Sequence, residues 1–89
     1  MIIHHRDLTL KKWFKLNIFE QMANIGSEVE RTILWREKNK KYSQLAFERA
    51  LELLDLTVED PKNKNRLKEL LRAREALVDY FCYDNIYHS

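Results

Sequence analysis

Apolar residues recur along most of this chain at the spacing of an α-helix. In residues 17–38 they are three or four positions apart, at Ile18, Met22, Ile25, Val29 and Ile33, so one face of a helix would be apolar. Comparable stripes occupy residues 42–57 and 61–83. The last stripe follows Asp60 and Pro61, a pair typical of a helix start, because aspartate caps and proline suits the first helical position. We therefore predict three helices over these ranges.

The short connections between these segments define the expected topology. Consecutive helices joined by so few residues must run antiparallel, which predicts an all-α, up-and-down bundle of three main helices. Glycine and proline occur once each, too rarely for the turns of a β-sandwich or barrel. We expect one domain, residues 17–89, after a partly ordered N-terminal arm, residues 1–16, whose Trp13 and Phe14 pack over the end of the bundle. Gly26 is expected where another backbone approaches its helix closely.

The middle helix, residues 42–57, has more apolar surface than two neighbours should cover. Its polar positions fall in one narrow arc, at Lys41, Gln44, Glu48, Glu52, Asp55 and Glu59. A helix at the edge of a bundle needs an apolar stripe only a little over ~100° wide. This surplus, with the thin stability margin of a small domain, predicts a homo-oligomer, most simply a dimer, or another protein partner. The candidate interface residues are Leu45, Leu53, Leu56, Trp35 and Tyr83.

Three charged residues fall at inward positions of the predicted helices. Helical phase places Arg74 in the centre of the last stripe, Arg49 in the middle apolar arc and Glu28 at the border of the first stripe. In an antiparallel bundle all three lie within roughly 6 Å along the axis. We expect a buried polar layer in which Glu28 accepts hydrogen bonds from the arginines, since a buried charge has to be paired. Such a layer would fix register and oligomeric state, or its excess positive charge would bind a phosphate or carboxylate.

Composition and charge narrow the classes of function. The chain has 89 residues, 45% hydrophobic and 34% charged, with a net charge of +2, which is typical of a packed helical protein and too weakly basic to indicate nucleic acid or a membrane surface. Basic residues cluster at 38–41 and 62–68. The topology puts these clusters at opposite ends, so no continuous nucleic-acid footprint is expected. Cys82 is the only cysteine, and without a recognisable signal peptide or membrane span we expect a cytoplasmic protein.

Catalytic chemistry finds no support in the sequence. Histidines occur only near the two termini, and the chain has no Glu-x-x-His pair for a carboxylate-bridged metal site and no glycine-rich phosphate loop. Cys82 has no histidine nearer than His88, which favours a packed thiol over a nucleophile. We expect a protein that is not an enzyme and that binds no cofactor or metal.

Three stretches carry a resemblance to known proteins. They are residues 23–31 (ANIGSEVER), residues 49–57 (RALELLDLT) and residues 74–81 (REALVDYF). Together they resemble a family of short uncharacterised prokaryotic helical-bundle proteins that has no assigned function. Members of that family continue past the region that corresponds to Asp84 and Asn85 into another aromatic-rich segment. The resemblance implies a helical fold without a mechanism, and it adds the expectation that this chain lacks a fourth helix.

A looser similarity is to the HEPN superfamily, helical bundles whose RNA-cleaving members place a histidine a few residues after an arginine near a helix end. Arg74 matches the arginine, but Asp79 stands where the histidine would be, so the similarity implies no ribonuclease chemistry. The function that we expect is a non-enzymatic protein–protein interaction module. The alternative is an anion- or RNA-related binding protein, a catalytically inactive HEPN-like bundle that uses Arg49 and Arg74.

Overall fold

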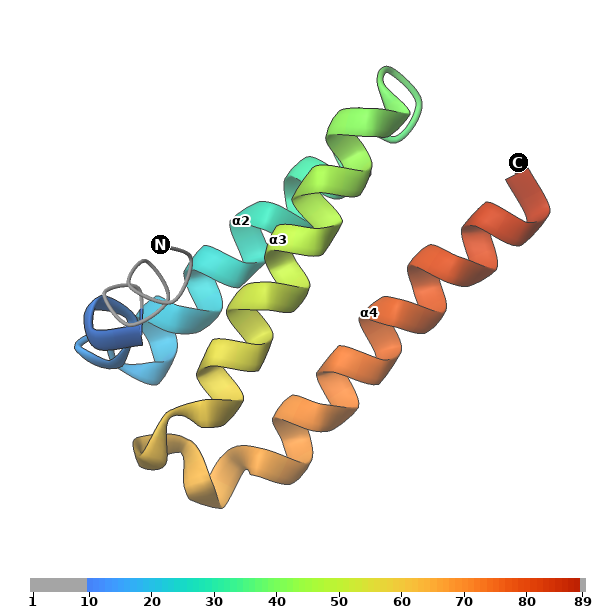
Figure 1. Ribbon diagram of the computed structural model, residues 1–89. Helices are drawn as coiled ribbons and strands as arrows, with labels where there is room; N and C mark the ends of the chain where they lie inside the picture. Colours follow the sequence, from blue (N-terminus) through green and yellow to red (C-terminus); the bar gives the residue numbers. More distant parts are fainter. Residues whose placement is uncertain (1–9, 89) are drawn as a thin grey trace, which may run out of the picture.

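A computed structural model describes residues 10–88, and their side chains as far as Cys82. All regular secondary structure in this part of the chain is helical, which confirms the predicted all-α class (Figure 1). A short helical segment at residues 10–14 precedes α2 (Ile18–Trp35), α3 (Lys40–Glu59), the 3-10 helix η1 (Pro61–Arg66) and α4 (Leu67–His88). The predicted helices are all present, with boundaries displaced by a few residues. Residues 1–9 of the predicted arm lie outside the described residues.

Asparagine side chains cap the N-termini of α2 and α3. Asn17 and Glu20 form a capping box, in which Asn17 Oδ1 accepts from the Glu20 N–H at 2.8 Å and Glu20 Oε1 accepts from the Asn17 N–H at 2.9 Å. Asn39 Oδ1 accepts from the N–H groups of Lys41 and Tyr42. These bonds satisfy backbone donors that the first helical turn leaves unpaired. The cap at Asn39 is the reason that α3 begins two residues earlier than the apolar pattern predicts.

The segment after Asp60 is a 3-10 helix, whereas the sequence predicts an α-helix from residue 61. The Asp60 carboxylate accepts from the Lys62 N–H at 3.0 Å, so the predicted cap is present. The Asn63 N–H donates to the Asp60 carbonyl at 3.0 Å, which is the tighter bonding pattern of a 3-10 helix. Because this tighter segment extends to Arg66, α4 begins at Leu67.

α2 and α3 lie side by side and run in opposite directions (Figure 1). The Ser43 hydroxyl of α3 donates to the Thr32 carbonyl of α2 at 2.6 Å. One and two turns further along α3, Ala46 and Ala50 are buried. Small side chains let two helices approach closely, since the distance between helix axes depends on the residues at the contact. This pair is the most closely packed part of the fold.

α4 returns alongside α3 but stands apart from the α2–α3 pair (Figure 1). The ring of Phe81 stacks on that of Phe47 in α3, with ring centroids 3.9 Å apart. Nearer to η1, Arg74 Nε donates to Asp55 Oδ1 at 2.8 Å, and Leu70 is buried in the core. α4 is therefore held mainly by α3.

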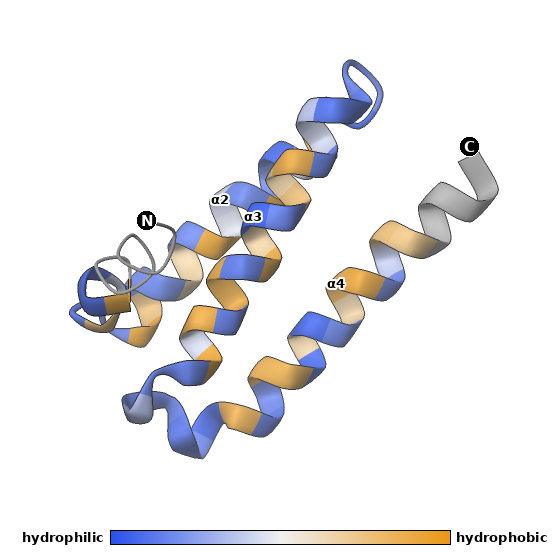
Figure 2. Cartoon of the chain, viewed as in Figure 1, coloured by the Kyte–Doolittle hydropathy of each residue, from blue (hydrophilic) through white to orange (hydrophobic). Residues whose placement is uncertain are grey.

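The apolar core combines α2, α3 and α4 with the segment before α2, while both helix connections are hydrophilic (Figure 2). Its buried members are Trp13, Ile25, Leu53, Leu54, Leu56 and Leu70. As expected, Trp13 packs over the end of the helices. The interface assignments of Leu53 and Leu56 are wrong, because both are buried within one chain, with Leu56 only 1% exposed. Residues 10–16 fold against α3, so much of its apolar arc is covered without a partner.

No backbone approaches Gly26, contrary to the expectation from its position in α2. A Cβ atom at this position would have no atom of another packed segment within 4 Å. The φ angle of Gly26 is not positive, so the conformation does not require glycine either. The residue therefore weakens α2 without a compensating contact inside this chain.

We predict that Gly26→Ala raises the free energy of unfolding by about 0.5–1 kcal/mol, because alanine loses less backbone entropy in a helix and meets no clash here. Urea unfolding followed by circular dichroism measures the change. Ala23→Gly, an exposed position one turn earlier, is the matched control and should lower the free energy by a similar amount. A loss of stability in Gly26→Ala would contradict the open space at this position.

Candidate functional site

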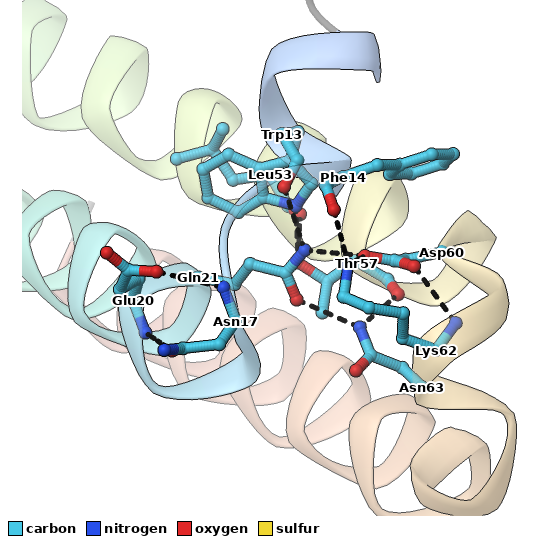
Figure 3. Close-up of polar contacts among 10 residues, drawn as sticks. All are labelled: Trp13, Phe14, Asn17, Glu20, Gln21, Leu53, Thr57, Asp60, Lys62 and Asn63. Carbon is cyan, nitrogen blue, oxygen red and sulfur yellow. Dashed lines mark hydrogen bonds and ion pairs between the residues drawn. The ribbon is translucent and has the colours of Figure 1, made fainter.

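The clearest constellation of polar side chains lies where residues 10–16, the start of α2 and the end of α3 meet (Figure 3). We call it the polar cluster, and its members are Trp13, Gln21, Thr57, Asp60, Lys62 and Asn63. All except Lys62 are buried. Buried polar groups are costly unless they are hydrogen-bonded, so their partners decide what the cluster can do.

Gln21 is the centre of the polar cluster. Its Nε2 donates to the Trp13 carbonyl at 3.0 Å and to Asp60 Oδ2 at 2.8 Å. Its Oε1 accepts from Asn63 Nδ2 at 2.9 Å. One amide thus connects α2 to the segment before it, to the end of α3 and to η1 (Figure 3).

Trp13 and Lys62 complete the connection between the N-terminal segment and the end of α3. Trp13 Nε1 donates to Thr57 Oγ1 at 2.9 Å, and that hydroxyl donates in turn to the Leu53 carbonyl at 2.8 Å. Lys62 Nζ donates to both Asp60 Oδ2 and the Phe14 carbonyl. The N-terminal segment is therefore fixed by directional bonds as well as by apolar packing.

The surroundings of Asp60 lower the pKa of its carboxyl group. Burial raises this pKa, because the charged form loses hydration. The hydrogen bonds from the Lys62 side chain, from Gln21 and from the Lys62 backbone N–H together outweigh burial, so the pKa lies below the ordinary value of 3.8. At neutral pH the carboxylate is charged and pairs with the Lys62 ammonium group at 2.6 Å.

The bonding of the polar cluster is complete. Among the described residues, every buried side-chain nitrogen or oxygen atom has a hydrogen-bond partner. No fully buried side-chain donor or acceptor of the cluster is therefore left unpaired, and none of its six members is a histidine that could move a proton. The arrangement holds segments together, and we assign it a structural role.

The buried polar layer expected from Glu28, Arg49 and Arg74 is not formed. Glu28 Oε1 instead accepts from Arg31, one turn further along α2, at 3.0 Å. Arg49 pairs with Glu52 at 3.2 Å within α3, and its side chain is 50% exposed. Arg74 pairs with Asp55 across the α3–α4 contact. The three residues enter three different ion pairs.

The physical reason is the cost of burying charge. An ion pair in the core gains less than it loses in hydration unless its geometry is very good, whereas long arginine side chains reach carboxylates at the protein surface. Arg49 and Glu28 still line one hollow of about 540 Å³, together with Lys12 and Arg31. Arg74 is not among the residues of that hollow.

An exposed apolar surface lies at the end of the α2–α3 pair that is far from η1. We call it the aromatic patch, consisting of Trp35, Tyr42 and Leu45, which are 41%, 55% and 52% exposed. The two rings pack edge to face with centroids 5.6 Å apart. The patch borders a hollow of about 370 Å³ whose wall also contains Glu28 and Arg31. Trp35 and Leu45 are thus exposed as interface candidates must be, while the side chain of Tyr83 lies outside those described.

A second apolar surface is the groove between α2 and α4, of about 550 Å³. Its walls come from Met22, Ile25, Gly26, Val29 and Ile33 of α2 and Ala73, Ala76, Leu77 and Tyr80 of α4, and Leu54 of α3 forms the floor. Sequence reasoning missed this groove, because it assumed that α4 packs against α2 as closely as α3 does. The stripe of α2 was correctly located, but part of it remains uncovered.

The end of the groove at Tyr80 carries a polar contact. Arg36, which follows α2, donates from Nη1 to the Tyr80 hydroxyl at 2.6 Å. Its guanidinium carbon also lies 5.2 Å from the centroid of the Tyr80 ring, within the range of a cation–π contact. α2 and α4 are therefore connected across one end of an otherwise apolar surface.

No protein-family model, curated protein or solved structure matches this chain, so its resemblance to uncharacterised prokaryotic proteins stays a prediction. None of the described helices combines the length and apolarity that a membrane span needs. Nor do the described residues contain a group of three His, Cys, Asp or Glu side chains placed to hold a metal ion. The function has to be inferred from the two exposed apolar surfaces.

We predict that Asp60→Asn lowers the free energy of unfolding by about 1–3 kcal/mol at pH 7, because the Lys62 and Gln21 donors lose a charged acceptor. The folded pKa of Asp60 is below the unfolded value. The contribution of the Asp60 carboxylate to the free energy of unfolding is therefore complete above the unfolded-state pKa of about 4. It is lost as the pH falls through the folded-state pKa. The difference between wild type and variant should shrink on acidification.

Urea unfolding between neutral pH and about pH 2.5 measures this difference. Glu48→Gln, at an exposed position of α3, is the control and should change the free energy by less than about 0.5 kcal/mol. A difference between wild type and Asp60→Asn that stays constant with pH would contradict the assignment.

Proposed function

We propose that this chain is a non-enzymatic protein–protein interaction module, an antiparallel helical bundle completed by another chain. A homodimer formed through the aromatic patch is the simplest such assembly. The observation that carries this proposal is the exposure of Trp35, Tyr42 and Leu45 side by side at one end of the α2–α3 pair. The homodimer expected from the sequence rested on the surplus apolar surface of α3, which residues 10–16 cover in part, leaving Tyr42 and Leu45 of that helix exposed. Its support now comes from the aromatic patch.

The chemistry of the aromatic patch suits an interface between identical copies. Tryptophan and tyrosine are enriched at energetically dominant interface positions, because they bury a large area and lose little conformational freedom. A two-fold interface brings the same surface of both copies together, so it needs charges of both signs. Glu28 and Arg31 supply these charges at the wall of the adjacent hollow. Two copies therefore bury their aromatic patches without facing like charges.

The alternative function is the binding of an anion or RNA. The position of Arg49 supports this alternative, whereas the position of Arg74 does not. Arg49 shares its hollow with Lys12 and Arg31, three cations against the one carboxylate of Glu28. Arg74 pairs with Asp55 on the other side of α3. Titration of single-stranded RNA against wild type and Arg49→Gln tests this alternative, and equal affinities for the two proteins would exclude it.

We predict that wild type is dimeric at micromolar concentration and that Leu45→Glu is monomeric, because a charge buried in the apolar centre of an interface costs several kcal/mol. The dimer dissociation constant should rise at least about tenfold. Size-exclusion chromatography with light scattering measures the mass, and far-ultraviolet circular dichroism verifies the helical content.

Leu34→Glu is the matched control, since Leu34 is an exposed leucine of α2 outside the aromatic patch. It should leave the dimer intact. A monomeric wild type, or a Leu45→Glu variant that stays dimeric, would overturn the homodimer.

A further inference from the structure

One end of the molecule brings together two basic segments that are far apart in the sequence. Residues 10–16 lie against η1 and the end of α3 (Figure 3). Lys62 Nζ of η1 donates to the carbonyl of Phe14, 48 positions earlier in the chain. The lysines that precede α2 are therefore next to those of η1. The basic cluster at 38–41 lies where α2 is connected to α3, at the opposite end (Figure 1).

This end of the molecule has a surplus of positive charge. We call residues 10–20 and 59–69 the basic end. They contain seven of the sixteen lysine and arginine residues but only four of the fourteen carboxylates, which are Glu20, Glu59, Asp60 and Glu69. The rest of the chain has the other nine cations and ten carboxylates. The net charge of +2 is therefore the sum of +3 at the basic end and −1 elsewhere.

The cations of the basic end are accessible. Lys62 is engaged, because its Nζ donates to both Asp60 and Phe14. The other six are exposed, and their side chains form no ion pair or hydrogen bond within the described part of the chain. They are Lys11, Lys12, Lys15, Lys64, Arg66 and Lys68. By contrast, Arg31 and Arg49, further along α2 and α3, each pair with a carboxylate. The surplus charge of the basic end is therefore available to a ligand from outside the chain.

The cations from η1 to the first turn of α4 are spaced like the charges of a nucleic-acid backbone. A 3-10 helix rises about 2.0 Å and an α-helix about 1.5 Å per residue, so Lys64 to Lys68 spans roughly 7 Å. Three successive phosphates of one duplex strand also span about 7 Å of the helix axis, at about 3.4 Å per step. Lys64, Arg66 and Lys68 therefore match three successive phosphates, and the lysines before α2 add charge beside them.

The aromatic residues of the basic end are badly placed to stack on bases. Trp13 is only 7% exposed and its Nε1 is bonded to Thr57, and Phe14 is packed against the core. Phe19 is exposed, but helical phase places it about 160° around α2 from Gln21, the side chain that bonds to η1. Binding of single strands depends on such stacking, whereas the backbone of a duplex is bound by charge alone. A duplex is therefore the better partner.

An acidic membrane fits the basic end less well than a nucleic acid does. A helix that lies on a membrane surface inserts a continuous apolar face. The apolar residues of the segment 10–16 pack against the core instead. Leu67 and Leu71 are exposed at the start of α4, but four residues cover only about 6 Å of helix. The basic end thus offers charge without an apolar face to insert.

We propose that the basic end binds the phosphate backbone of a double-stranded nucleic acid without reading its sequence. Such binding needs exposed cations that displace counterions from the duplex, and it needs no pocket. The sequence predicted no continuous footprint because only the clusters at 38–41 and 62–68 were compared. The fold supplies a second cluster, residues 11–15, beside residues 62–68.

The proposed site is separate from the surfaces described above. The aromatic patch lies at the opposite end of the α2–α3 pair, so a homodimer formed through it leaves both basic ends exposed. Arg49 does not belong to the basic end, so the site also differs from the one considered for the alternative function. The proposal therefore goes beyond the interaction module and does not depend on it.

The probe is a fluorescein-labelled DNA duplex of about 16 base pairs and arbitrary sequence, and fluorescence anisotropy measures its affinity. Raising the salt concentration from about 50 to about 200 mM should weaken binding by on the order of tenfold or more, as about three phosphate contacts predict. An RNA duplex and a second DNA sequence should bind within about tenfold of the first, and a single strand should bind more weakly. Binding that does not depend on salt, or a single strand that binds more tightly than the duplex, would contradict the proposal.

The test variant replaces three cations by neutral residues, in Lys64→Gln/Arg66→Gln/Lys68→Gln. Its matched control is Lys38→Gln/Lys40→Gln/Lys41→Gln, which removes the same charge at the opposite end. Both should keep the helical content of wild type, because these exposed side chains form no ion pair in the described structure. At low salt the test variant should bind the DNA duplex at least about tenfold more weakly and the control within about threefold of wild type. Equal losses in the two variants would show an effect of net charge alone and overturn the site.

Lys11→Gln/Lys15→Gln tests whether the segment before α2 belongs to the same surface. It leaves η1 and α4 unchanged and should weaken duplex binding at least about threefold. Wild-type affinity in this variant would overturn the joint surface, even if the triple variant failed to fold.

Three further measurements separate the proposal from the other candidates. Arg49→Gln should bind the duplex like wild type, and a loss there without a loss in the triple variant at 64–68 would place the site elsewhere. Leu45→Glu should still bind the duplex as a monomer, so failure of the homodimer leaves this proposal standing. Vesicles containing phosphatidylserine should bind more weakly than the duplex in a co-sedimentation assay at the same salt concentration. Tighter binding to the vesicles would make a membrane the partner and overturn the proposal.

Discussion

The side-chain amide of Gln21 connects the parts of the chain on which the rest of the structure depends. It bonds to the backbone of Trp13, to the Asp60 carboxylate and to the Asn63 amide. Because all these groups are buried, removing any one would leave another unpaired, at a cost of about 1–3 kcal/mol. The bonds therefore fix together the path of the segment before α2, the end of α3 and the fold of η1, from which α4 departs.

Helical phase predicted the elements well, because burying one face of a helix imposes its period on the sequence. Phase gives the direction of a side chain around its own helix, but it does not identify the neighbour on that side. Leu53 and Leu56 were correctly placed on an apolar arc, yet both are buried in one core cluster that includes Trp13 of the preceding segment. The surplus on α3 was thus inferred without the cover that the preceding segment provides. The apolar surface that stays exposed is the aromatic patch and the groove between α2 and α4.

The candidate site was less predictable, because helical periodicity does not show which polar side chains become buried or which partners they find. Arg49 was placed inward from its Cα position, but its long side chain reaches Glu52 at the surface. Gln21 was overlooked, although it lies one turn from Ile25 on the side of α2 that faces α3. Its burial depends on Asp60 and Asn63, about forty residues away in the chain, and only the folded chain brings these groups together.

The two ends of α4 are held by contacts of different strength, and this difference bears on the groove. Near η1, α4 follows a segment fixed by buried bonds to Asn63, and Leu70 is in the core. At the other end, the Arg36 bond to Tyr80 is exposed, where water competes for both groups. Moving α4 away from α2 near Leu70 would therefore disrupt the core, whereas near Tyr80 it would break the Arg36 contact and disturb the neighbouring Phe47–Phe81 stack. The Phe47–Phe81 stack limits how far α4 moves away from α3 at that end.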